Sequence, residues 1–354
     1  MRLLLHIGTE KTGSTALQEY LESRRRTLAE AGFLLPDFLE GSNHLELACM
    51  FMADRKDDEF LSSKGFSTPE ARARRREELL SALADQVKAN RKSASTMLIS
   101  SEHFQSRLTD PKEVDQFIRS IAPIFCEVKV VCYLRRQERM ALSFYTQKLR
   151  GGYVPPNILP VRSVRHTRPN PPIFFDYESL LDRWAGAVGE ENVLPVVYER
   201  SSLASGDVIV DFFQRIGCEF PGHTDSLSLN TSYDAAGQLA MLAFNRLNFH
   251  RREEATEVRM KLDRFLQEQA DGRPLLPPSS EAREFNEAFT ESNRRVAERW
   301  FNRKELFQES GLEYPAEGTS PDWEKATTLL AKFLSHPDYS ANYSPDHTET
   351  NSSA

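Results

Sequence analysis

Four short runs of apolar residues constrain the fold of this 354-residue chain more than any other feature. Each run is nearly continuous in Val, Ile and Leu rather than alternating, which is typical of strands covered on both faces. Segments with helical periodicity lie between the runs. The alternation predicts an α/β protein in three layers, with a central and mostly parallel sheet. The predicted strands are Arg2–Ile7, Thr96–Ser100, Val128–Leu134 and Asn192–Tyr198.

Helices are predicted on either side of these strands. In the first part of the chain they cover residues 14–31, 69–90, 112–121, 138–149, 177–188 and 207–216. Past Gly222 no strand-like run appears, and the segments 232–249, 252–269 and 282–307 have helical patterns. We therefore expect one domain over residues 1–335, made of an α/β core (1–222) and an added C-terminal helical layer (223–335). The polar residues 336–354 are predicted to be a disordered tail.

Charge and cysteine usage narrow the class of protein. The formal charge of −7 and the pI of about 5.7 argue against nucleic acid as a partner, because such binding needs a basic face. The apolar run after Met1 is too short for a signal sequence or a membrane span. Without a C-x-x-C spacing, the cysteines are interpreted as reduced thiols. These features predict a soluble, cytoplasmic protein, and its oligomeric state is unknown. The cysteines are Cys49, Cys126, Cys132 and Cys218.

The segment HIGTEKTGSTALQEYL, residues 6–21, runs from a strand end into a helix. Free backbone N–H groups at the start of a helix, together with its positive dipole end, attract phosphate. Glycines let the main chain approach such a ligand closely. The segment therefore predicts a phosphate-binding loop, although similar turns also occur without a ligand. Its glycines, lysine and hydroxyls are Gly8, Gly13, Lys11, Thr12, Ser14 and Thr15.

The position of the lysine distinguishes this loop from the usual nucleotide triphosphate loop, G-x-x-x-x-G-K-[ST]. Lys11 precedes the second glycine by two residues instead of following it, so it cannot occupy the same place beside the β- and γ-phosphates. No predicted strand ends in an acidic residue that would hold Mg²⁺, and Val128–Leu134 is followed by two arginines. A P-loop-like fold is thus expected, without the metal and nucleotide chemistry of a common P-loop enzyme.

A second strand, turn and helix begins at VVCYLRRQERMALSFY, residues 130–145. Arg135 stands at the carboxyl end of the strand, where open α/β sheets bind ligands, and its planar donors suit a phosphate. Ser143 follows eight residues later, about two helical turns along the chain. Two anion sites on two strand ends favour a nucleotide that carries phosphates at two positions.

The two motifs together resemble the signature motifs of the sulfotransferases that use 3′-phosphoadenosine 5′-phosphosulfate (PAPS). Residues 175–217 are also similar to that family, so the resemblance covers about the first 220 residues. It implies that the first loop binds the 5′-phosphosulfate, that Arg135 and Ser143 bind the 3′-phosphate, and that Tyr198 lies near the adenine. The implied contacts in the first loop are Lys11, Thr12, Gly13, Ser14 and Thr15.

One departure from the family pattern lies beside Arg135. The usual Arg-Asn-Pro of the second motif is Arg135-Arg136-Gln137 in this chain, a variant associated with bacterial relatives. Arg136 would then either add a phosphate contact or face solvent.

The resemblance implies a transferase that moves a sulfuryl group from PAPS to a hydroxyl, with a saccharide or glycolipid as acceptor and no metal. Lys11 would stabilise the charge that develops on the leaving phosphate. Two alternatives stay open: a P-loop kinase or nucleotide hydrolase, and a non-catalytic nucleotide-binding protein on the same fold.

Transfer to a hydroxyl also needs a base that removes the acceptor's proton. Glu102 and His103 follow a predicted central strand, and His44 lies in the long loop 34–64, where some carbohydrate sulfotransferases carry their base. All three are candidates. Loops 34–64 and 151–173 are expected to be either lids or binding surfaces, or else mere surface insertions. The basic segment 161–169 could steer an anionic acceptor or close over the nucleotide.

Overall fold

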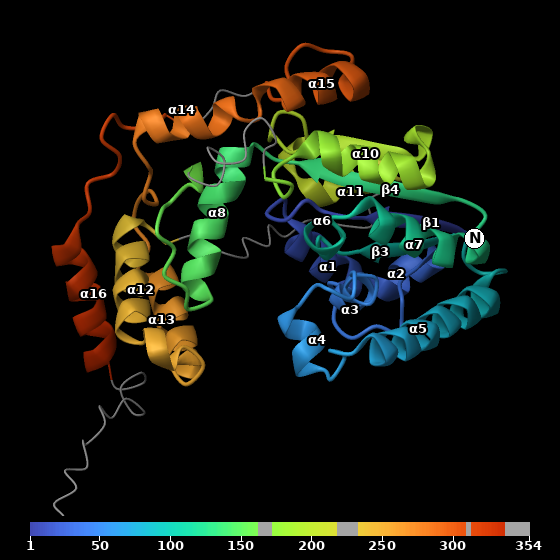
Figure 1. Cartoon of the computed structure of the whole chain (residues 1–354), viewed down its shortest axis with the longest axis horizontal. Coiled ribbons are helices and arrows are strands. Elements are labelled where there is room, and N and C mark those ends of the chain that lie inside the picture. Colours follow the sequence, from blue (N-terminus) through green and yellow to red (C-terminus); the bar gives the residue numbers. More distant parts are fainter. Residues whose placement is uncertain (162–171, 218–232, 309–312, 337–354) are drawn as a thin grey trace, which may run out of the picture. The chain divides into compact units, whose positions relative to one another are not determined.

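The computed structural model describes residues 1–161, 172–217, 233–308 and 313–336. Contacts between residues divide the chain into two compact units (Figure 1). The first unit comprises Met1–Met140, Arg162–Leu227 and Asn286–Gly311, and the second comprises Ala141–Val161, Ser228–Phe285 and Leu312–Ala354. The units interleave along the chain, so they do not follow a boundary near residue 222. The single domain over 1–335 stays a prediction, and the tail beyond His336 lies outside the described residues.

The first unit contains a five-stranded sheet in the order β2-β3-β1-β4-β5, and every pairing is parallel. Four strands lie where the apolar runs predicted them. The fifth, β2, has only two residues, too few to give a sequence pattern. The strands are β1 (Arg2–His6), β2 (Phe33–Leu34), β3 (Thr96–Ser100), β4 (Val128–Leu134) and β5 (Val193–Val197).

Helices cover both faces of this sheet. Successive side chains of a strand point to opposite faces, so both faces carry apolar side chains that helices bury. Leu3 and Leu5 of β1 pack in one core cluster, whereas Leu98 of β3 and Tyr133 of β4 pack in another. This arrangement confirms the predicted three-layer α/β fold with a parallel sheet. On the first face lie α3 (Leu45–Cys49), α4 (Glu59–Ser63), α5 (Pro69–Asn90), α6 (His103–Arg107), α7 (Pro111–Ile121) and α10 (Tyr177–Val188), and on the second α1 (Ser14–Ser23), α2 (Arg25–Glu30) and α11 (Val208–Arg215).

Several predicted helix boundaries were wrong. The helix expected over 14–31 is interrupted at Arg24, which leaves the helical conformation (φ −110°, ψ 14°), although no glycine or proline marks the break. The loop expected over 34–64 contains α3 and α4. Each has five residues, and helices this short are set by packing rather than by a periodic sequence. The helix expected over 282–307 is split into α14 (Ser279–Glu287) and α15 (Thr290–Phe301).

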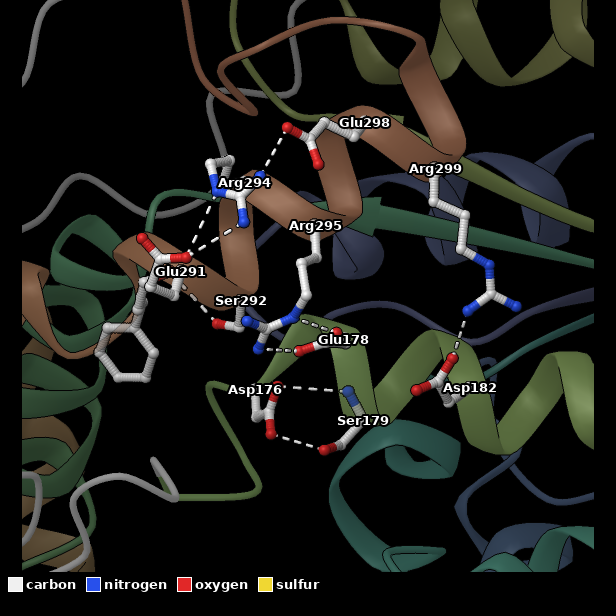
Figure 2. A network of polar contacts seen from close by, with 11 residues as sticks. Asp176, Glu178, Ser179, Asp182, Glu291, Ser292, Arg294, Arg295, Glu298 and Arg299 are labelled. Carbon is white, nitrogen blue, oxygen red and sulfur yellow. Dashed lines mark hydrogen bonds and ion pairs between the residues drawn. The ribbon is translucent and has the colours of Figure 1, made fainter.

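Helix α15 belongs to the first unit although it comes late in the sequence, and its Arg295 and Arg299 reach carboxylates of α10 (Figure 2). Val296 and Ala297 enter the core cluster that contains α10. Outside this apolar contact, the guanidinium of Arg295 binds both carboxylate oxygens of Glu178 at 2.5 and 2.6 Å, and Arg299 binds Asp182 at 2.5 Å. Exposed ion pairs thus surround the apolar contact between α15 and α10.

The described residues of the second unit form helices and no strand. Buried Leu262, Phe265 and Phe333 form part of its separate core. The last helix of this core, α16 (Trp323–Ser335), was not among the helices predicted from the sequence. The helices are most of α8 (Gln137–Arg150) and of α14, with α12 (Ala235–Leu247), α13 (Thr256–Glu268) and α16. In the described part of the chain, no helix is both long and apolar enough to cross a membrane.

Candidate active site

The loop between β1 and α1 is held against the end of β4. The N–H of Thr9 donates to the carbonyl of Tyr133 at 2.8 Å, and the N–H of Tyr133 donates to the carbonyl of Gly8 at 2.5 Å. The Thr9 hydroxyl donates to the same Tyr133 carbonyl at 2.9 Å. The hydroxyl of Thr12 donates to the carbonyl of Thr9 at 2.5 Å. The proton of Thr12 therefore stabilises the turn, so this hydroxyl is not a free donor for a ligand as the loop stands.

Both glycines of the loop are required by their surroundings. Gly8 has a φ of 93°, and a Cβ there would come 2.9 Å from the Cβ of Glu102. Gly13 has a φ of 79°, and a Cβ there would come 2.9 Å from Cγ1 of Val208. Any other residue would be strained in this left-handed region and would also clash. The two glycines thus let the loop pass close to Glu102, which follows β3, and close to Val208, at the start of α11.

The loop leads directly into α1. Gly13 is the residue before the helix, and among the described residues no side chain caps the helix start. The first backbone N–H groups of a helix have no partner within the helix. Ser14 is buried and Thr15 is exposed, so the two hydroxyls differ in their access to a ligand. A helix start of this kind can attract an anion, and phosphate binding here stays a prediction.

Arg135 contacts the loop from the end of β4. Its Nη1 donates to the carbonyl of Lys11 at 2.5 Å, and its guanidinium carbon lies 5.9 Å from the centre of the Tyr198 ring. The hydroxyl of Tyr177 donates to the Arg135 carbonyl. Burial lowers the pKa of Arg135, but a guanidinium remains charged in proteins. Arg135 is therefore a half-buried cation, fixed at its backbone and beside the loop.

Tyr198 follows β5 and completes this group. Its N–H donates to the carbonyl of Leu134 at 2.7 Å, and burial raises the pKa of its hydroxyl. That hydroxyl lies 3.5 Å from the position a Cβ on Gly13 would take. The structure thus brings together Lys11, Arg135 and Tyr198 from three neighbouring strand ends.

Arg136 has a different environment from its neighbour, and the expectation that it simply faces solvent was wrong. Its guanidinium forms ion pairs with Glu199 at 3.4 Å and with Glu138 at 3.7 Å, and it packs over the ring of Phe307. Both carboxylates are almost completely buried, and burial raises the pKa of Glu138. Arg136 thus compensates these buried charges, and a phosphate contact by this residue stays untested.

Ser143 lies half-buried on α8 and belongs to the second unit. Its contact with the anion bound by Arg135 therefore stays a prediction. Most of the predicted basic segment 161–169 lies outside the described residues, as does part of the loop 151–173.

His44 is buried at the start of α3, with a φ of 44°. Its Nδ1 lies 3.2 Å from the backbone nitrogen of Ser100, the last residue of β3. A backbone N–H can only donate, so Nδ1 accepts and the neutral ring carries its proton on Nε2. Burial, with a smaller effect of Arg25, lowers the pKa of His44 to about 4. The lone pair that a base would use is therefore engaged in holding the end of β3.

His103 is in a similar situation on α6. Its Nδ1 lies 2.7 Å from Nη1 of Arg107, and a guanidinium can only donate. Burial and the charge of Arg107 lower the pKa of His103 to about 4. The lone pair of His103 thus also has a structural partner.

Glu102 lies between β3 and α6. It occupies the position before α6, but its side chain does not cap that helix. The amide nitrogen of Gln18 donates to its Oε2 at 2.7 Å. Its side-chain stem lies against Gly8, so the carboxylate is beside the phosphate-type loop. Of the three candidate bases, Glu102 has the geometry that leaves an oxygen lone pair for a proton.

Two residues near Glu102 were not singled out from the sequence. Glu10 is half-buried in the loop, and its pKa is raised mainly by burial and further by the charge of Glu102, against a lowering hydrogen bond from Ser106. Gln18 is buried on α1. Its position four residues after Ser14, on the inner face of the helix, was a signal that could have identified it.

Comparisons with known proteins add little to this geometry. No protein-family model matches the chain. An uncharacterized protein of Archaeoglobus fulgidus is 29% identical over 185 residues, which are 51% of this chain and 47% of that protein. The chain thus spans about half the length of this curated relative. A sulfotransferase from Alicyclobacillus acidocaldarius has a structure that matches over 72% of this chain and 95% of its own, at 15% identity and a TM-score of 0.39. A likeness at that score carries no argument about function.

Proposed function

We propose that this protein is a sulfotransferase that moves a sulfuryl group from PAPS to a hydroxyl of a saccharide or glycolipid. The observation that carries the proposal is the group formed by Lys11, Arg135 and Tyr198 beside an uncapped helix start. It combines the backbone of the loop that carries Lys11, a guanidinium at the next strand end and a flat ring. These are the elements that a nucleotide with two separate phosphates requires.

The first loop would bind the phosphosulfate. Backbone N–H groups of Gly13, Ser14 and Thr15 would hold the 5′-phosphate, and Lys11 would meet the oxygen that bridges phosphorus and sulfur. Arg135, with Ser143, would bind the 3′-phosphate, and the ring of Tyr198 would lie near the adenine. The sequence resemblance supplies these roles, and the contacts among the first-unit residues support them.

The transfer breaks one bond and forms another. The bond between sulfur and the bridging oxygen breaks, and its electron pair stays on the phosphate oxygen beside Lys11. The acceptor oxygen forms the new bond to sulfur, and its proton passes to Glu102. We assign the base role to Glu102 because the lone pairs of His44 and His103 have structural partners. The product nucleotide is 3′,5′-adenosine bisphosphate.

One observation favours a rival function. Glu102 lies beside the loop, and in a kinase or nucleotide hydrolase a carboxylate there could hold Mg²⁺. A calorimetric titration with 3′,5′-adenosine bisphosphate, and another with ATP and Mg²⁺, separates the two functions. We expect the bisphosphate to bind at least about tenfold more tightly than ATP, with no change in EDTA. Tighter binding of ATP, or binding that requires Mg²⁺, would contradict the sulfotransferase proposal.

A further inference from the structure

We infer that Gln18 is a positioning residue for Glu102. The inference rests on the proposed function, in which Glu102 takes the acceptor's proton. Gln18 does not touch the reacting atoms. It holds the carboxylate in one orientation and supplies a donor that favours its ionised form, which is the form that can accept a proton.

The orientation of the Gln18 amide follows from its partners. Its Nε2 lies 2.7 Å from Oε2 of Glu102 and 3.5 Å from the carbonyl oxygen of Ser100. Both partners are acceptors, so the nitrogen rather than the oxygen of the amide must face them. Gln18 is only 3% exposed, so water competes little for these bonds.

The stem of Glu102 is fixed independently of its carboxylate. The close approach of Gly8 leaves no room for a side chain between the loop and Glu102. Packing against Gly8 therefore sets the stem, and Gln18 sets the carboxylate. A base held at two points is pre-organised, which reduces the reorganisation needed when the acceptor binds.

Other titrating groups face Glu102 from the elements around it. His6 on β1 and His103 on α6 are both influenced by its charge, and Glu10 in the loop is a second carboxylate nearby. Gln18 is a neutral donor on α1, so it holds the Glu102 carboxylate without a positive charge that would form an ion pair with it.

The test compares three variants. Gln18→Met removes the donor and keeps a similar volume. Gln18→Glu places a second carboxyl against Glu102, so the pair would share a proton. Gln86→Met is the matched control, because Gln86 is also a buried glutamine, on α5, that donates to a backbone carbonyl at 3.0 Å. Sulfate release from PAPS, with water as the acceptor, is measured from pH 4 to 9 for each protein.

We expect the acid limb of the pH–rate profile to move to higher pH by about one unit in Gln18→Met and by more in Gln18→Glu. The control should keep the wild-type limb. A ¹³C NMR titration of the Glu102 carboxyl, assigned with Glu102→Gln, should show the same displacement in Gln18→Met. The thermal midpoints report any loss of folding separately.

Three results would overturn the inference. One is a lower rate in Gln18→Met with an unmoved acid limb, which indicates a merely structural role. Another is a displaced NMR titration that the rate does not follow, which removes Glu102 as the base but leaves the sulfotransferase proposal standing. The third is a wild-type protein that binds 3′,5′-adenosine bisphosphate no better than ATP and releases no sulfate, which contradicts the proposed function itself.

Discussion

Positive charges are used differently at the carboxyl edge of the sheet and on α15. At the edge, Lys11 and Arg135 are half-buried; the Arg135 guanidinium donates to the Lys11 carbonyl, and the Arg135 carbonyl accepts from the Tyr177 hydroxyl. On α15, Arg294, Arg295 and Arg299 form ion pairs with exposed or partly exposed carboxylates (Figure 2). Under the proposed function, cations serve ligand binding in the first region, whereas in the second they form ion pairs at the surface.

The difference shows what determines the importance of a charge. Exposed pairs are screened by water and salt and lose side-chain entropy, so each contributes little. Cations in a partly dry site interact strongly with an anion that arrives there. Arg135 and Arg136 show that neighbours in sequence can belong to different classes, because one faces the loop and the other faces two buried carboxylates.

The largest effect is expected at Lys11. Lys11→Met should reduce sulfate release from PAPS by about 10³-fold, roughly 4 kcal/mol, because charge on the leaving phosphate loses its stabilising ammonium. The control is Lys129→Met, at the start of β4 and far from the loop in the sheet. Single-turnover kinetics measure both. An equal loss of rate in Lys11→Met and Lys129→Met would contradict the view that charges at the carboxyl edge of the sheet differ from charges on the surface.

Arg135→Ala should weaken binding of 3′,5′-adenosine bisphosphate by about 10²-fold, roughly 3 kcal/mol, because a phosphate loses its charged donors. Calorimetry measures this affinity. Arg136→Ala should instead lower the free energy of unfolding by about 2–3 kcal/mol, because it removes the guanidinium that forms ion pairs with the buried carboxylates of Glu138 and Glu199. The opposite result, with affinity lost only in Arg136→Ala, would exchange the roles of the two arginines.

His44 should give the protein a stability that depends on pH. Its pKa is about 4 in the folded chain and about 6.5 when unfolded, so between these values only the unfolded chain binds the proton. The free energy of unfolding therefore falls as the pH drops from 6.5 to 4, by up to about 3 kcal/mol from this residue. In His44→Gln, whose amide oxygen can still accept from Ser100, that part of the fall should disappear in urea titrations.

The same variant separates a structural His44 from a catalytic one. At pH 7 we expect His44→Gln to keep its sulfate release. A loss of about 10²-fold or more would return the base role to His44. His6 and His103, whose pKa values are also lowered to about 4, should preserve the remaining acid sensitivity of the variant.

The smallest effect is expected on α15. Arg295→Ala removes a bidentate pair with Glu178, yet it should lower the free energy of unfolding by less than about 1 kcal/mol, because half of the Arg295 side chain is exposed. The effect should shrink further in high salt. Thermal unfolding at two ionic strengths measures it. A loss as large as that of Arg136→Ala would show that this surface network is part of the core's stability.

Much of the fold could be predicted from residue patterns. The four long strands, and helices α5 and α10, lie where their periodicity placed them, because each has enough residues for a pattern to repeat. The two-residue strand β2 and the short helices α3 and α4 could not be predicted, since packing rather than periodicity creates them. The break at Arg24 has no sequence signal at all.

The candidate site divides in the same way. The loop was predictable from its residues, because at Gly8 and Gly13 a side chain would be strained and would clash, and the residue types indicated the cations at Lys11 and Arg135. Only the tertiary structure distinguished the candidate bases. A histidine's lone pair is available or engaged according to which donor faces it, and those donors, Ser100 and Arg107, are brought there by folding. The same holds for Gln18 and Glu102, which are 84 residues apart in the chain and meet through one hydrogen bond.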